Sequence, residues 1–397
     1  MRDAVIVDIV RSPMAKGRMA KEGRAGGALS NVHPVELLGQ VIGALVKRND
    51  FDAASVDDVI TGCVGQVGEQ SGGIGRWAWL GAGLPEHVPA TVIQRACGSA
   101  QQAMDFAAQG VIAGVYDIVV ACGVESMSRV PMGTSRMGKD PFGPSVTSRY
   151  GELVPQGISA ELVAARWNLS REALDEYAVA SHARAAKADL GPEIVPVIVP
   201  NDAAEIVVDT DETIRPGTTV DGLAELQPSF YSVDVAQRFP EIQWRITAGN
   251  SSQLTDGASA ALIMSAERAE SLGLRPRARF HAFAVASVDP ITMLTGPIPA
   301  TEKVLARSGL SLDRIDHYEV NEAFASVPLA WQKHFHADPD RLNPRGGAIA
   351  LGHPLGASGV RLMTSMVHGL EETGGRYGLQ TMCEAGGMSN ATIIERL

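Results

Sequence analysis

The chain has few cysteines, few aromatic residues and no excess of positive charge. Its 397 residues include only four cysteines, and their spacing fits neither a disulfide framework nor a metal-ligand motif. Lys and Arg total 34 against 45 Asp and Glu, for a net charge of −11, and no basic stripe is interleaved with aromatic residues. This balance argues against a nucleic-acid partner. No apolar run approaches the roughly 18 residues that span a bilayer, so we expect no membrane segment.

Targeting signals are also missing from both ends of the sequence. The apolar run Ala4–Val7 lacks the basic region and cleavage site of a signal peptide, and the final residues Glu395–Leu397 are not a peroxisomal signal. Together with the sparse cysteines, this predicts a protein of the reducing cytoplasm. The length predicts two or three compact units with a large apolar interior.

Cys97 lies just before a predicted amphipathic helix. Apolar residues recur at 100, 103, 104, 107, 108, 111 and 112, which is the spacing of a helix buried on one face. The sulfur is therefore expected at a helix N-terminus, where unpaired N–H groups and the helix dipole favour a thiolate. A thiolate attacks carbonyl carbons. The alternative is a small buried hydrophobic residue, which is the usual role of a free cysteine.

The second half of the chain repeats the element order of the first. Val56–Ile60 parallels Ile315–Glu319, and each of Cys97 and His353 opens a Gly/Ser turn, an apolar-faced helix and then a strand. The corresponding segments are separated by nearly the same number of residues. This predicts two similar α/β units whose sheets are covered on both faces.

The stretch between the two units has a different composition. From about Glu125 to Arg245, loops rich in Met, Arg, Pro and Gly surround two predicted helices, one over about 158–167 and one from an N-cap at Ser170 to about Lys187. Long irregular insertions usually form lids or binding loops. The alternative is a solvated surface domain with a role in assembly.

Four Gly-rich or polar turns fall at the ends of predicted elements. They are centred on Cys97, on Asn321–Phe324, on Gly352–Pro354 and on Cys383–Gly387. Pseudo-twofold packing of the two units would bring Cys97 and His353 face to face, as a nucleophile and its base. The glycines allow close approach of a substrate and of N–H groups that stabilise an oxyanion. Taken singly, the histidine could be a turn residue and the asparagine a helix cap.

Together these turns resemble the motifs of the thiolase family. Gln94–Ala100 is similar to its nucleophile motif, Asn321–Ala325 to its NEAFA box, Gly346–Pro354 to its histidine motif, and the run from Cys383 to its last cysteine-glycine motif. The resemblance covers essentially the whole chain in order. It implies a duplicated, layered α-β-α-β-α fold with an inserted loop domain, a coenzyme A thioester substrate and a homodimer or homotetramer.

The resemblance also implies the domain limits. Residues 1–124 plus 246–272 would form the first repeat and residues 273–397 the second. Residues 125–245 would form the inserted loop domain, with roles in coenzyme A binding and assembly.

The family's catalytic roles carry over to matching residues. Cys97 would accept the acyl group and His353 would take its proton, while Cys383 would be the second acid/base. Asn321 would hold the water that, with His353, stabilises an enolate oxygen. The N–H groups of Cys97 and Ala385 would form a second oxyanion hole.

Three positions resemble coenzyme A contacts. Ser252, in the run Thr247–Ser252, would lie near the pantetheine, Phe230 would pack on it, and Arg215 would lie near the nucleotide. These matches are less specific, because the stretch 231–244 is longer than the usual connection. Coenzyme A would be a co-substrate, with no covalently bound cofactor and no metal.

The chain departs from the family pattern at three glycines. Ala385 and Ser389 replace the first and last glycines of the final motif, and Ala100 replaces a glycine after the nucleophile. Alanine still donates its N–H if its φ is negative, so the oxyanion hole is expected to survive in a narrower cavity.

The predicted reaction is thiolytic cleavage of 3-ketoacyl-CoA by coenzyme A through an acyl-cysteine, in β-oxidation of fatty acids or steroid side chains. The segments 68–71 and 77–87 resemble degradative actinobacterial thiolases, and the loop after Glu125–Ser128 lacks the histidine of biosynthetic members. The alternative within the family is an acetyl-CoA C-acetyltransferase that forms acetoacetyl-CoA.

Three other classes of protein fit the sequence less well. A ketosynthase would normally carry a second histidine in place of Cys383. A non-catalytic acyl or sterol carrier would not need three intact reactive residues. A zinc site is disfavoured because Cys63 and Cys122 are predicted inside strands.

Overall fold

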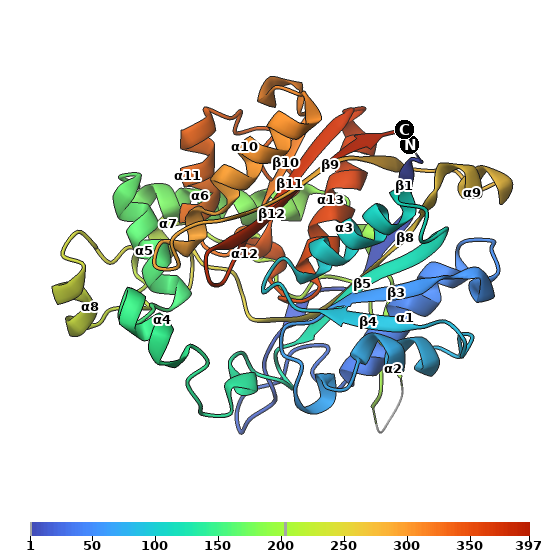
Figure 1. The fold of residues 1–397 in the computed structure, drawn as a ribbon. Helices are drawn as coiled ribbons and strands as arrows, with labels where there is room; N and C mark the ends of the chain where they lie inside the picture. The colour runs from blue at the N-terminus through green and yellow to red at the C-terminus, as the bar shows by residue number, and fades with distance from the viewer. Residues whose placement is uncertain (1, 202–204) are drawn as a thin grey trace.

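The computed structural model describes residues 2–201 and 205–397 and contains one large mixed sheet. Its strands, read across the sheet, follow the order β10-β11-β12-β9-β1-β8-β5-β3-β4, and the short β2 pairs with β8 (Figure 1). The bounds are β1 (Ala4–Arg11), β2 (Ala15–Lys16), β3 (Asp58–Gly62), β4 (Ala90–Ile93), β5 (Ile118–Ser126), β8 (Thr255–Ser265), β9 (Ala278–Ser287), β10 (His317–Val320), β11 (Tyr377–Glu384) and β12 (Met388–Arg396).

Strand order shows the duplication. The two halves of the sheet meet where β1 pairs with β9 over two residues, Val5 with Arg279 and Ile6 with Ala278. Outward from this junction, the two halves show the same pattern of pairing: two antiparallel pairs followed by one parallel pair. The strands are β1-β8-β5-β3 in one half and β9-β12-β11-β10 in the other. The duplicated α/β fold expected from the sequence is confirmed.

Thirteen helices are found in the described parts of the chain. The bounds are α1 (Pro34–Lys47), α2 (Ile74–Gly81), α3 (Ser99–Ile112), α4 (Gly143–Tyr150), α5 (Gln156–Arg166), α6 (Arg171–Lys187), α7 (Val220–Ala224), α8 (Val233–Arg238), α9 (Ala266–Ser271), α10 (Pro297–Ser308), α11 (Ser326–Phe335), α12 (Ala348–Leu351) and α13 (Ser358–Thr373). In the residues that the structure covers, no helix is both long and apolar enough to cross a membrane.

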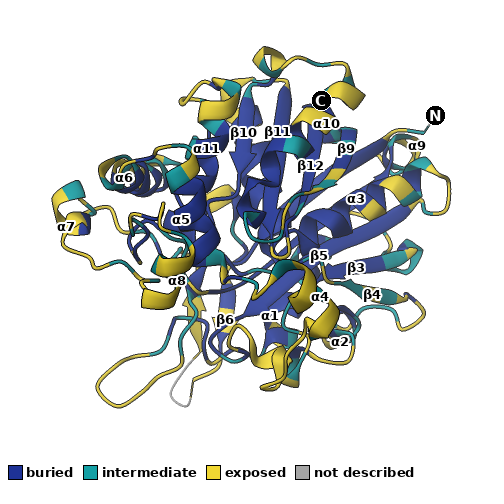
Figure 2. Cartoon of the chain, turned by 60° about the vertical axis from the view of Figure 1, so that its left-hand side comes forward, coloured by how far each residue is buried: buried dark blue, intermediate teal, exposed yellow. Residues whose placement is uncertain are grey.

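Helices α3 and α13 form the middle layer, between the two halves of the sheet (Figure 1), and strand β5, which packs on α3, is buried along its whole length (Figure 2). One apolar core joins them to both repeats: Ala103, Ala107 and other small α3 side chains pack with Val360 and Met363 of α13. The small side chains let α3 lie close to two surfaces at once. As equivalent elements, α3 and α13 begin at the turns that carry Cys97 and His353.

The region between the repeats contains both predicted helices and several unpredicted elements. Ser170 caps α6 and accepts a hydrogen bond from the N–H of Ala173, as expected, and α5 begins at Gln156, two residues before the predicted start. Helices α4, α7 and α8 and the hairpin of β6 (Val197–Val199) and β7 (Ile206–Val208) were not predicted. Strand β5 continues to Ser126, past the expected limit at residue 124.

A buried ionic network links three parts of the chain. Arg11 of β1 donates to Glu193 (2.9 Å) and to Asp211 (2.7 Å), and Arg345 donates to the other oxygen of Glu193 (3.0 Å). Burial opposes the charge on Glu193, but the two guanidinium groups outweigh it and lower its pKa. The network fixes the inserted region against both repeats.

Candidate active site

Cys97 lies in the turn between β4 and α3, in contact with the second repeat. Its side chain is 3% exposed and packs on Leu362 of α13 and Met382 of β11. The preceding Ala96 has φ 44°, a left-handed conformation that is disfavoured for alanine. Ser99 holds this turn, because its hydroxyl accepts from the N–H of Arg95 (2.9 Å) and donates to the carbonyl of Ala96 (2.6 Å).

Burial dominates the electrostatics of Cys97. It raises the pKa of the thiol, and the nearby Cys383 and Glu384 raise it further, whereas the side-chain amide of Gln156 lowers it. The expectation that the helix N-terminus keeps this sulfur as a thiolate is therefore wrong for the free protein. The dipole of one helix end is outweighed by the loss of solvation. The thiol needs a base to take its proton.

His353 follows α12 and is held by three hydrogen bonds. Its N–H donates to the hydroxyl of Thr255 (3.0 Å), and its Nδ1 lies 2.5 Å from the hydroxyl of Ser358. The Ser358 hydroxyl donates to the carbonyl of Pro354 (2.9 Å), so it accepts from Nδ1–H. This assigns the tautomer and leaves Nε2 with the lone pair, which accepts from the side-chain amide of Asn321 (3.3 Å).

The imidazole of His353 is uncharged in the free protein, and the burial that keeps it neutral also makes it a weak base. Burial, together with the nearby Arg361, lowers its pKa to about 3. The ring is therefore neutral at pH 7 and can accept a proton at Nε2.

The positioning of His353 also depends on glycine. Gly352 has φ 89°, and a Cβ at this position would lie 2.2 Å from the hydroxyl of Thr255. Only glycine combines this backbone conformation with so close a contact.

Asn321 joins His353 to Cys383. It follows β10, and its N–H donates to the carbonyl of Thr381 (3.1 Å) on the parallel strand β11. Its amide oxygen is buried without a hydrogen-bond partner among the described residues. Burial raises the pKa of Cys383 to about 12, opposed by the Asn321 side chain and the backbone of Ala323. Cys383 in turn is close enough to Cys97 to raise its pKa, so the four residues form one cluster.

The N–H groups of Cys97 and Ala385 are not used within the protein. In the ranges 2–201 and 205–397, neither donates a hydrogen bond to another residue. Ala385 follows β11 and has no positive φ, whereas the next two residues, Gly386 and Gly387, have φ 81° and 82°. The alanine thus occupies a position that does not require glycine.

Ser389 is accommodated in the sheet. It pairs with Cys383 across β11 and β12, and its hydroxyl donates to the carbonyl of Met382 (2.6 Å). The third departure, Ala100, is buried in the middle-layer core. The substitutions thus remove no reacting group.

The three residues that resemble coenzyme A contacts lie beside this cluster. The N–H of Ser252 donates to the carbonyl of Ala323 (2.9 Å), and Phe230 packs edge-on against Phe324, with ring centroids 6.0 Å apart. Arg215 is exposed and donates to the side-chain oxygen of Gln253 (2.8 Å).

Gln253 connects the residues that resemble coenzyme A contacts to His353. Its carbonyl accepts from the N–H of His353 (3.2 Å), and its side chain donates to the carbonyls of Thr213 and Ile349. The segment 250–253 therefore bridges the two parts of the site.

Two buried carboxyl groups that the sequence argument gave no role fix the surrounding loops. Glu322 accepts from Tyr177 (2.9 Å) and Ser181 (2.7 Å) of α6 and from Asn343 (3.0 Å) and the N–H of Ile349 (3.1 Å). It attaches the inserted region to the loops of Asn321 and His353.

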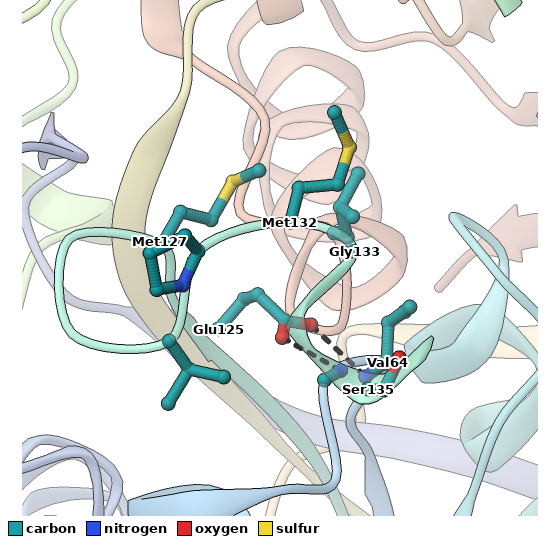
Figure 3. Close-up of a pocket in the computed structure, with 10 residues that line it drawn as sticks. Val64, Glu125, Met127, Met132, Gly133 and Ser135 are labelled. Atoms are coloured by element: carbon teal, nitrogen blue, oxygen red, sulfur yellow. Dashed lines mark hydrogen bonds between the residues drawn. The ribbon is translucent and has the colours of Figure 1, made fainter. Parts of the chain in front are cut away.

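Glu125 is the second of these carboxyl groups, and it holds the turns of Val64 and Gly356. It accepts from the N–H groups of Val64, Gly65 and Gly356, each at 2.9 Å, and it lines a small hollow (Figure 3). Met127, Met132 and Leu355 are among its other lining residues, and Leu355 also packs on the Cys97 cluster.

Several site residues had no sequence signal. Ser358 lies in the Gly/Ser turn that follows the histidine motif, but the contacts of Thr255, Gln253 and Gln156 depend on chain segments that are remote in sequence. Within the described ranges, no three His, Cys, Asp or Glu side chains group in a way that could hold a metal ion.

Comparisons with known proteins cover the whole chain. Residues 5–267 match the family model described as "Thiolase, N-terminal domain" and residues 274–396 match "Thiolase, C-terminal domain". The steroid 3-ketoacyl-CoA thiolase FadA6 of Mycobacterium tuberculosis is 44% identical, over 100% of this chain and 95% of the relative. The 3-ketoacyl-CoA thiolase of Pseudoalteromonas translucida is 40% identical over 100% of both. The crystal structure of the Bacillus anthracis acetyl-CoA acetyltransferase superposes with a TM-score of 0.88 at 36% identity, covering 100% of this chain and 99% of that one.

Proposed function

Because the chain belongs to the thiolase family, it is an acyltransferase, and we propose that it cleaves 3-ketoacyl-CoA thiolytically through an acyl-Cys97 intermediate. The observation that carries this proposal is the position of Asn321, whose side chain donates to Nε2 of His353 and also acts on the thiol of Cys383. A base, an acid and a nucleophile gathered in one buried cluster are the groups that this reaction needs.

In the first half-reaction, His353 Nε2 takes the proton of Cys97, and the sulfur attacks the keto carbon of the substrate. The bond between the α-carbon and the keto carbon then breaks, and acetyl-CoA leaves as an enolate that Cys383 protonates. A positioned acid contributes about 100-fold or more. Donors at the enolate oxygen, from His353 and a water on Asn321, contribute about 3 kcal/mol each.

In the second half-reaction, the thiol of coenzyme A gives its proton to the Cys383 thiolate and attacks the acyl-Cys97 carbonyl, and the Cys97 sulfur leaves with the proton that His353 holds. The N–H groups of Cys97 and Ala385 stabilise the oxyanion, which agrees with their lack of other partners. The shortened acyl-CoA is released and the Cys97 thiol is restored. Coenzyme A is thus a co-substrate, bound along Ser252, Phe230 and Arg215.

We place the reaction in β-oxidation of fatty acids or steroid side chains. Support comes from the 44% identity to a relative named as a steroid 3-ketoacyl-CoA thiolase, against 36% to the acetyl-CoA acetyltransferase. A reducing cytoplasm suits the chemistry, because both reacting cysteines must be thiols, and all four cysteines are free.

The test is acyl-enzyme formation. Mixed with a 3-ketoacyl-CoA and no free coenzyme A, the protein is expected to gain the mass of the shortened acyl group on Cys97. Cys97→Ser should lower the rate of this step by at least about 100-fold, since the hydroxyl is far less acidic. The matched control is Cys122→Ser, a buried cysteine of β5.

Equal acylation of the two variants would overturn the proposal. The same assay across chain lengths tests the pathway: longer and steroid-derived 3-ketoacyl-CoAs should react well, and a sharp preference for the four-carbon substrate would contradict the degradative role.

We also propose that the chain forms a homodimer or homotetramer. Strand β4 lies at the end of the sheet and pairs only with β3 in the described chain. An unpaired strand edge is a template for pairing with another chain.

A further inference from the structure

A buried carboxyl group without a partner lies against the turn of Cys97. Glu384 is the last residue of β11 and is 0% exposed, and neither carboxyl oxygen has a hydrogen-bond partner in the described residues. A Cβ placed on Gly98 would lie 1.9 Å from its Oε1. The carboxyl group therefore packs directly on the backbone of the residue after Cys97.

The alternation of β11 explains this contact. Met382 contacts Cys97, whereas Cys383 belongs to the core of the second repeat. Because successive side chains of a strand point to opposite faces, Glu384 lies on the face of Met382, toward Cys97. Two consecutive residues of β11 thus act on the site from opposite faces of the sheet.

The surroundings of Glu384 favour a protonated carboxyl group. The charged or titratable groups that face it are Arg95, Asp105, Cys97 and Cys383. Arg95 makes no ion pair with it, and the Nε of Arg95 is itself buried without a partner in the described structure.

A polar side chain beside it offers an acceptor. The amide nitrogen of Asn390 lies at the same point of Gly98 and donates to the Gly98 carbonyl (3.1 Å), and the amide oxygen of Asn390 is unpartnered in the described residues. A carboxylate requires donors, while a carboxylic acid can donate to such an acceptor.

We propose that Glu384 is a positioning residue that acts through Cys97: protonated near neutral pH, it allows negative charge to develop on the Cys97 sulfur, and once ionised it opposes that charge. This inference rests on Cys97 being the nucleophile, as proposed above. It assigns a role to the residue between Cys383 and Ala385 that forms no bond to substrate.

The charge on Glu384 acts on Cys97 in the direction that this proposal requires. Burial raises the pKa of Glu384 to about 8, opposed by Arg95 and assisted by Asp105. The ionised form of Glu384 raises the pKa of Cys97. As the pH rises through about 8, the growing charge on Glu384 therefore counteracts the deprotonation of Cys97, and the reactivity of the sulfur increases less than that of an isolated thiol.

The experiment measures the rate at which iodoacetamide alkylates Cys97 between about pH 6.5 and pH 9.5, by mass spectrometry of the Cys97 peptide. Glu384→Gln removes the ionisation at nearly constant shape. The ratio of the rate at the high pH to that at the low pH should be about tenfold larger in Glu384→Gln than in the natural protein, which corresponds to one pKa unit.

A second variant keeps the test independent of how Glu384→Gln folds. Asp105 is a buried carboxyl group of α3 that raises the pKa of Glu384 when ionised and is not among the groups that act on Cys97; burial raises its own pKa to about 8, so the two carboxyl groups titrate together. Asp105→Asn should retain the bend in the pH profile and move it to lower pH.

Superimposable profiles for Glu384→Gln and the natural protein would overturn this inference, as would an unmoved bend in Asp105→Asn. Failure of the proposed function is a different result: Cys97 would then form no acyl-enzyme in any of the three proteins.

Discussion

At the scale of the residue, Ser358 decides what His353 can do. Its hydroxyl accepts from Nδ1–H and is itself held by the carbonyl of Pro354. The proton on Nδ1 leaves Nε2 as the only basic nitrogen, facing Asn321. A hydroxyl group that touches no substrate thus determines the direction of proton transfer.

We expect Ser358→Ala to lower kcat by roughly 10- to 100-fold with little change in KM, because the ring loses its orientation and its fixed tautomer. Steady-state thiolysis measures this split. Ser365→Ala is the control, since Ser365 lies two turns further along α13 and makes only a long contact to Glu193 (3.4 Å). Equal kcat values for the two variants would contradict the role of Ser358.

At the scale of the element, one carboxyl group attaches α6 to the catalytic loops. Glu322 accepts hydrogen bonds from two α6 side chains and from the loops that carry Asn343 and Ile349. The motif residue after Asn321 is thus a structural cross-link between the inserted region and the second repeat.

Glu322→Ala leaves the hydroxyl groups of Tyr177 and Ser181 and the N–H of Ile349 without an acceptor, so we expect a loss of about 3 kcal/mol in the free energy of unfolding. Urea denaturation measures it, and faster proteolysis within residues 125–245 should accompany it. The matched control is Glu172→Ala, an exposed acidic residue in the first turn of α6. The prediction is wrong if both variants unfold at the same urea concentration.

The helices that the sequence predicted are those whose signals lie in neighbouring residues. Helix α6 was predicted from its Ser170 cap and α3 from its apolar period, because caps and periodicity are properties of neighbouring residues. Helices α4, α7 and α8 lack the apolar period: α7, although capped by Thr219, and α8 are only five and six residues long, and α4 has no buried residue.

At the scale of the whole molecule, the edge strand β4 determines how copies of the chain can associate. The N–H groups of Val59 and Cys63 donate to the carbonyls of Pro89 and Ile93. The backbone groups of Pro89 and Ile93 therefore face β3. By alternation, the N–H of Val92 faces the free edge.

We therefore expect Val92→Pro to convert the oligomer to smaller species, because proline removes that N–H and leaves the pairing with β3 intact. Sedimentation equilibrium measures the mass. Val92→Thr retains the N–H and should assemble like the natural protein. An unchanged mass for Val92→Pro would exclude this edge as the interface.

Local signals in the sequence were sufficient for the duplicated fold, and the family resemblance singled out the four residues that lie in one cluster. Turn chemistry, apolar period and motif spacing are written in adjacent residues, and the repeated order of elements is visible without coordinates. The replacement of glycine by Ala385 could also be judged locally, since it depends on one φ angle.

Packing decided the rest. Whether Cys97 is a thiol or a thiolate depends on burial, and burial reversed the effect expected from the helix N-terminus. The tautomer of His353, the cross-link at Glu322 and the unpartnered carboxyl group of Glu384 arise from contacts between residues that lie on different elements or far apart in the chain. Solvation and hydrogen bonding of buried groups are set by all the segments that surround them, so they are defined only once the two repeats and the inserted region have packed together.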